Sequence, residues 1–156
     1  MGASPYFYFV DHEPNVQAAL DKLREREFKA GRYNPVMPFP RFPVDLNSPG
    51  PGARHATIDE ALEASDADGT RSILDLDHVS DEPFDPDSES DDFGSLSPLG
   101  DDVLEEYFGT TEPTREQVDD GVWDIFELLE RGMGIYIVVY EAGKPSELFI
   151  AGSSFD

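Results

Sequence analysis

The strongest constraint on the fold is a pair of apolar runs near the end of the chain. Residues 135–140 are β-branched or aromatic, residues 147–151 form a second apolar run, and a turn with Gly143 and Pro145 separates them. This pattern is typical of a β-hairpin with a longer loop over residues 141–145. Both faces of the first strand are apolar (Ile135, Ile137 and Val139 on one, Tyr136, Val138 and Tyr140 on the other). Such a strand belongs in the middle of a sheet, because a solvated edge would expose one apolar face.

Hydrophobic spacing and capping residues predict the remaining elements. Strands are predicted at residues 6–10 and 71–76, and helices at residues 14–30, 57–65, 101–108 and 114–131. Two of these helices begin with a capping box, at Thr57 and at Thr114. We therefore predict a single α+β domain over residues 1–156, with a four-stranded, mostly antiparallel sheet and four helices packed on one face. One parallel strand pair is compatible with this order, because helix 14–30 and the loop after it are long enough for a crossover.

Two long segments have neither helical nor strand periodicity. Residues 32–56 contain six prolines with aromatic residues between them. Because proline removes backbone donors, we expect an ordered loop that packs on the body of the protein rather than a helix or a central strand. Residues 80–98 are acidic, contain prolines and have few apolar side chains, so we expect a mobile loop there.

The charge of the chain is large and unevenly distributed. The net charge is −23. Residues 1–56 hold seven basic and six acidic side chains, whereas residues 57–156 hold four basic and 28 acidic side chains. A surface of this sign repels phosphates and anionic headgroups, which argues against nucleic-acid and membrane partners. One explanation is adaptation to a high-salt cytosol, which we favour because lysine is scarce and such composition shifts are usually global. The other explanation is a dedicated acidic surface that binds a basic protein. The nearly neutral charge of residues 1–56 favours it, because adaptation to salt should affect every exposed surface.

The residue inventory excludes several chemistries. The chain has no cysteine, which excludes disulfides, thiolate metal sites and a cysteine nucleophile. The three histidines, His12, His55 and His78, are too scattered for a local metal motif, so we predict no metal and no cofactor. The first residues lack a basic leader region, and no apolar stretch approaches the ~18 residues of a membrane span. These observations predict a cytoplasmic protein.

One basic cluster runs against the overall charge. Lys22, Arg26 and Lys29 have helical spacing, and interleaved glutamates make ordinary surface pairing one interpretation. The other interpretation is an anion-binding site that involves loop 32–54, because guanidinium groups bind carboxylates and phosphates. Its candidate residues are Arg24, Arg32, Tyr33, Asn34, Arg41 and Arg54.

Three functions follow from these features. The leading hypothesis is a small non-catalytic protein of a regulatory or neutralising type that binds another macromolecule, because no catalytic set is recognisable and the acidic surface suits a basic protein. The alternative is a small enzyme or ligand-binding domain with the anion site in loop 32–54. The third is an acidic mimic of nucleic acid formed by residues 57–156. A concave cleft lined by arginine and aromatic residues would favour the second function, and a flat acidic face would favour the first.

Overall fold

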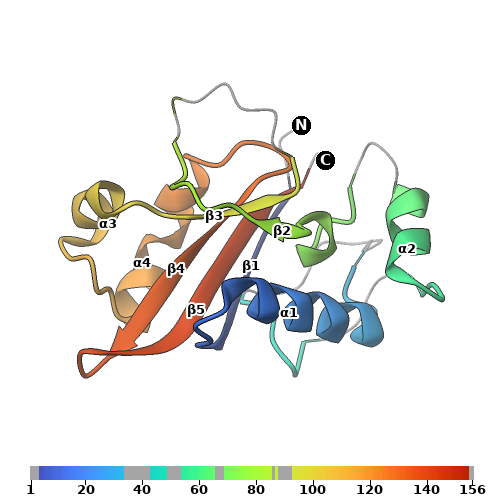
Figure 1. The fold of residues 1–156 in the computed structure, drawn as a ribbon, viewed down its shortest axis with the longest axis horizontal. Coiled ribbons are helices and arrows are strands. Elements are labelled where there is room, and N and C mark those ends of the chain that lie inside the picture. Colours follow the sequence, from blue (N-terminus) through green and yellow to red (C-terminus); the bar gives the residue numbers. More distant parts are fainter. Residues whose placement is uncertain are drawn as a thin grey trace.

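The computed structural model of the chain describes residues 4–33, 43–48, 54–65, 69–85, 87 and 93–154. These residues form a five-stranded sheet with the strand order β1-β5-β4-β3-β2 (Figure 1). The strands are β1 (Pro5–Asp11), β2 (His78–Val79), β3 (Ser95–Pro98), β4 (Gly134–Glu141) and β5 (Lys144–Ser153). The helices are α1 (Val16–Ala30), α2 (Ile58–Ser65), α3 (Asp101–Phe108) and α4 (Arg115–Phe126). The predicted α+β class is therefore confirmed.

The C-terminal hairpin lies in the interior of the sheet, as its apolar pattern predicts. β4 is the central strand, with β5 antiparallel on one side and β3 on the other. The connecting turn is shorter than the predicted loop, because Ala142 and Gly143 turn the chain at φ of 51° and 77°. Two successive positive φ values are characteristic of the two-residue turns whose twist matches that of paired strands. β1 pairs antiparallel with the other edge of β5, with Pro5 opposite Ser153.

The prediction of four mostly antiparallel strands is wrong in two details. The sheet has a fifth strand, and both β2 with β3 and β3 with β4 are parallel pairs. β2 and β3 have only two and four residues, and they flank or overlap the acidic segment 80–98, so no alternation marks them. The predicted strand 71–76 instead contains a 3₁₀ turn, Ile73–Asp75, capped by the Ser72 side chain. Arg71 has φ of 55°, a left-handed conformation that no strand accommodates.

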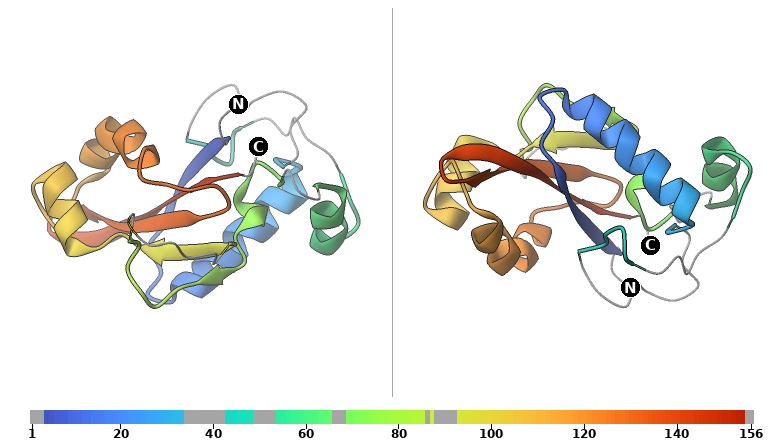
Figure 2. Two further views of the ribbon diagram at one scale, coloured as in Figure 1. Left: turned by 90° about the horizontal axis from the view of Figure 1, so that it is seen from above. Right: turned by 90° about the horizontal axis from the view of Figure 1, so that it is seen from below.

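The helices cover both faces of the sheet, so the prediction of helices on one face is wrong. Figure 2 shows α1 and α4 on opposite sides of the strands. Side chains alternate along each strand, so β1 presents Tyr6 and Tyr8 to α1, and Phe7 and Phe9 to the opposite side. On the opposite side they pack with buried residues of α3 and α4 (Leu104, Val118, Val122 and Ile125). β4 is apolar on both faces because helices pack on each side of the sheet.

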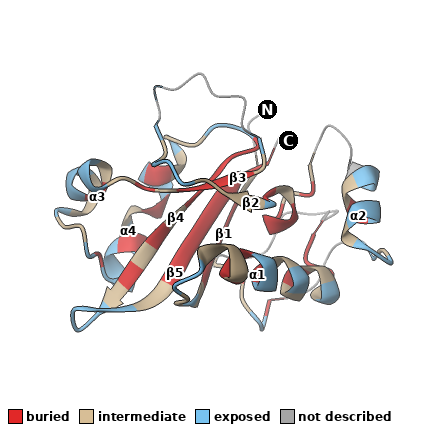
Figure 3. Ribbon diagram, in the orientation of Figure 1, coloured by how far each residue is buried: buried red, intermediate tan, exposed pale blue. Residues whose placement is uncertain are grey.

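Buried residues concentrate in the sheet and in the inward sides of α1 and α4, whereas α2 is largely exposed (Figure 3). In the predicted loop 32–56, Val44 is buried and its N–H donates to the Phe7 carbonyl at 3.1 Å, so this part packs on the edge of β1. Residues 34–42 and 49–53 of that loop, and residues 86 and 88–92 of the predicted mobile loop, lie outside the described residues. The second predicted loop also contains β3, and α4 ends at Phe126 rather than at residue 131.

Candidate functional site

The outward side of α4 carries an aromatic residue within a row of carboxylates. Thr114 begins the helix with a capping box, in which its hydroxyl accepts from the Gln117 N–H and the Gln117 side chain accepts from the Thr114 N–H. Val118, Val122 and Ile125 are buried against the sheet. Residues three or four apart share a helix face, so the outward row contains Glu116, Asp119, Asp120, Trp123 and, just beyond the helix, Glu127, all of them exposed. We call this row the α4 face.

Trp123 is packed on one side and open on the other. Its ring lies edge-on to Phe7 of β1, with centroids 5.9 Å apart, and 5.5 Å from the ring of Phe126. Even so, 56% of its surface is exposed. Indole rings are usually placed where their apolar body is covered, so an exposed tryptophan held rigidly by neighbouring rings is a feature of binding surfaces.

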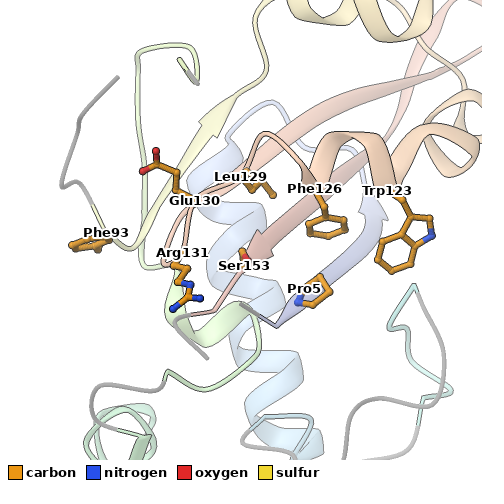
Figure 4. A pocket seen from close by; sticks show the side chains of 8 residues that line it. All are labelled: Pro5, Phe93, Trp123, Phe126, Leu129, Glu130, Arg131 and Ser153. Carbon is orange, nitrogen blue, oxygen red and sulfur yellow. The ribbon is translucent and has the colours of Figure 1, made fainter. Parts of the chain in front are cut away.

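A hollow of about 710 Å³ opens beside Trp123 (Figure 4). Its described lining residues come from the start of β1, the end of β5, α4 with the segment after it, and the turn before β3 (Pro5, Ser153, Trp123, Phe126, Leu129, Glu130, Arg131 and Phe93). Figure 4 shows Trp123 and Phe126 on one side, and Phe93, Glu130 and Arg131 on the other. Phe93 is 51% exposed. Hollows of this size are typical of binding sites.

The segment that contains α3 and α4 is strongly acidic. Residues 101–131, all of which the structure describes, contain eleven carboxylates, and every one of them is exposed. The same range has two basic residues. Arg115 donates to Glu147 at 2.9 Å and lies 4.3 Å from the Phe9 ring centroid, and Arg131 lines the hollow. Carboxylates on this scale attract cations and slow the approach of anions.

Three of the predicted anion-binding arginines donate hydrogen bonds to acceptors within the protein itself. Arg32 is buried, and its guanidinium donates to both carboxylate oxygens of Glu27 and to the Ser48 carbonyl. Arg24 donates to the Leu74 carbonyl at 3.0 Å, and Arg54 donates to the Lys29 carbonyl at 2.8 Å, near the end of α1. Arg32 and Arg54 therefore both bond near the C-terminal end of α1, whereas Arg24 bonds to the 3₁₀ turn.

Tyr33 belongs to the same end of α1. Its ring stacks on Phe28, and its hydroxyl lies 3.1 Å from Nδ1 of His55. The other two candidate residues, Asn34 and Arg41, lie outside the described residues. The anion site of loop 32–54 therefore stays a prediction.

Asp75 is a partly buried acidic group, which the sequence analysis did not predict. Its carboxylate accepts from the Thr70 N–H and hydroxyl and from the Ser154 hydroxyl, at 2.7 to 2.8 Å. Burial raises the pKa of the Asp75 carboxyl, and this effect outweighs the hydrogen bonds, which lower it. These hydrogen bonds connect Thr70 and Asp75 to Ser154, the residue that follows β5.

The sequence predictions did not include Trp123 or Phe93. Trp123 could have been identified as a candidate from the sequence. It is the only tryptophan in the chain, and it lies next to the apolar stripe of its helix but not within it. Phe93 has no such signal, because it follows an acidic segment without periodicity.

Within the described residues, no group of three histidine, aspartate or glutamate side chains is placed to hold a metal ion. His55 contacts Tyr33 and His78 contacts Asp77, in different parts of the fold. No described helix combines the length and the apolar character that a membrane span requires. Comparisons of the chain with protein-family models, with curated proteins and with solved structures find no match.

Proposed function

We propose that the protein is a non-catalytic binding module that docks a basic protein through the α4 face and the hollow beside it. The observation that carries this proposal is Trp123, a rigidly packed but half-exposed indole in the middle of a row of exposed carboxylates. Interfaces commonly combine a few aromatic residues that contribute most of the binding free energy with a charged rim that sets the partner and the association rate.

The sign of the charge selects the class of partner. Eleven carboxylates over residues 101–131 disfavour a phosphate backbone and favour lysine and arginine side chains. Exposed ion pairs contribute little individually, so the carboxylates supply attraction and orientation rather than most of the affinity. The indole and the apolar part of the hollow supply the contact area that holds the complex together.

A pair of charge-matched variants tests whether the site, rather than the total charge, binds the partner. The site variant Asp120→Asn/Glu127→Gln removes two charges from the α4 face, and the control variant Asp59→Asn/Glu63→Gln removes two exposed charges from α2. The probe is a lysine-rich peptide, titrated by calorimetry at low salt. We expect the site variant to bind about five- to tenfold more weakly than the native chain, because the two lost exposed pairs amount to about 1–1.4 kcal/mol.

The control variant should bind within about twofold of the native chain. Equal weakening in the two variants would show that the peptide responds to net charge alone, and would contradict the proposal. The same conclusion would follow if neither the native chain nor its variants bound the peptide at low salt.

A further inference from the structure

We infer that the hollow beside Trp123 accepts one apolar side chain from a lysine- or arginine-rich segment of the partner; this inference rests on the proposed function. The first observation is the exposed aromatic surface. Among the described large apolar side chains, Leu46, Phe93 and Trp123 are the ones that are mostly exposed, and two of these three line this hollow. Exposed apolar patches rimmed by polar groups mark interaction sites.

The lining of the hollow favours an apolar side chain over a charged one. Five of the eight described lining residues are apolar or aromatic (Pro5, Phe93, Trp123, Phe126 and Leu129). The charged side chains among these described residues are Glu130 and Arg131, which are neighbours in the sequence. The opposite charges of these two lining residues offset each other, so the burial of apolar surface decides which side chain enters the hollow.

The spacing of the carboxylates then fixes the pattern of the segment. Asp119 and Asp120 lie about one helical turn before Trp123, and Glu127 lies about one turn after it, a rise of about 5.4 Å in each direction. In an extended segment, side chains two residues apart are separated by about 6.6 Å. Basic residues two positions before and two positions after an apolar residue would therefore reach carboxylates on both sides while the apolar residue enters the hollow.

The partner is also more easily recognised through its side chains than by pairing as an extra strand with the edge of the sheet at β1. β1 is an edge strand, and Phe7 of this strand contacts Trp123. The Phe7 carbonyl already accepts a hydrogen bond from the Val44 N–H, so the backbone of β1 is engaged next to the site. A second copy of the chain is disfavoured as the occupant, because each copy carries a net charge of −23.

Two peptides of equal charge test this inference. Lys-Lys-Gly-Leu-Gly-Lys-Lys and its counterpart with serine in place of leucine differ only in the central side chain. Binding is followed by calorimetry and by the emission of Trp123, which is unambiguous because the chain has no other tryptophan. We expect the leucine peptide to bind about tenfold or more tightly than the serine peptide, and to shift the emission of Trp123 to shorter wavelength as water leaves the ring.

Three variants connect the preference to the hollow. Phe93→Ser and Trp123→Ala should each reduce the preference for leucine to about twofold or less, and Phe93→Ser retains the fluorescent reporter. Phe93 is exposed and lies outside the helices and strands, so its replacement keeps the test valid even where Trp123→Ala fails to fold. Asp120→Asn/Glu127→Gln should weaken both peptides equally and leave the preference unchanged.

The outcomes separate this inference from the proposed function. Suppose that both peptides bind with equal affinity and that the site variant weakens both more than the control variant does. The proposal of a basic partner is then retained, and the inference that an apolar residue enters the hollow is contradicted. If the two charge variants weaken binding equally, the proposed function itself fails. If the emission of Trp123 changes with protein concentration and sedimentation shows a dimer, a second copy is the occupant and the inference is overturned.

Discussion

The buried ion pair between Glu27 and Arg32 allows the sharpest prediction about stability. Glu27 lies in the last turn of α1 and is fully buried, and the Arg32 side chain that follows the helix is 5% exposed. Arg32 Nε lies 3.0 and 2.8 Å from the two Glu27 oxygens, and its Nη2 lies 2.5 Å from Oε2. Arg26 Nε adds a bond of 3.1 Å to the same carboxylate. One carboxylate therefore balances two guanidinium groups.

Glu27→Gln should destabilise the protein by about 3–5 kcal/mol, because it leaves the Arg32 charge buried without an anion. Domains of this size have a total free energy of unfolding of about 5–15 kcal/mol, so this loss is a large fraction of the stability. The double variant Glu27→Leu/Arg32→Met removes both charges and retains volume, so we expect it to be more stable than Glu27→Gln. Urea unfolding at constant pH and salt, followed by circular dichroism, measures the three free energies.

A cost below about 1 kcal/mol for Glu27→Gln would refute this reasoning, because it would mean that water or a rearranged partner compensates the charge of Arg32. A double variant that is less stable than Glu27→Gln would also refute it. That result would show that the ion pair contributes more than an apolar replacement of similar size.

Four further predictions concern other parts of the molecule. Because the folded-state pKa of Asp75 is raised, its contribution to stability is fully present below the ordinary carboxyl value of 3.8 and is lost as the pH rises through the raised pKa. Asp75→Asn should therefore flatten the pH dependence of the free energy of unfolding above that value, as measured by urea titrations at several pH values. Ile137→Asp should destabilise more than Val138→Asp, because Ile137 is 1% exposed and Val138 only half-buried, and thermal melts of the soluble variants check the order. Thr114→Ala should cost about 1 kcal/mol through the lost capping box of α4, as urea unfolding would report. The melting temperature should rise from low to molar KCl, because salt screens the repulsion behind the net charge of −23, and a flat response would contradict adaptation to a high-salt cytosol.

The elements with strong local signals were predictable from the sequence. α1 ends at Gly31, whose φ of 71° suits the predicted end of the helix, although the helix begins after Asn15 rather than at residue 14. β4 and β5 have long apolar runs. The segments that differ from the prediction lack such signals. Residues 71–76 contain enough apolar side chains for a strand, but the Ser72 cap and the bonds from Thr70 and Ser154 to Asp75 hold them in a 3₁₀ turn. The bond from Ser154 spans 79 positions, so no local pattern indicates it.

The candidate site was only partly predictable for the same reason. The negative charge of residues 101–131 is evident from composition, and the exposed carboxylates follow from the helical spacing of α3 and α4. The hollow joins Pro5, Ser153 and Phe93 to α4, and the strand order that brings these residues together is a long-range property of the sheet. The arginine cluster was predictable as a cluster, but the burial of Glu27 beneath Arg32 was not, because an interleaved glutamate usually pairs at the surface.

Docking of a basic segment at the α4 face can be tested by backbone amide chemical shifts measured during a peptide titration. The leucine-centred lysine peptide is added to the isotope-labelled chain at low salt, and the shift changes are mapped on the structure. We expect the largest changes on residues 115–131 and on Phe93, with small changes in α1 and α2. Changes spread evenly over all exposed carboxylates, or centred on α2 or on the predicted anion-binding arginines, would contradict it.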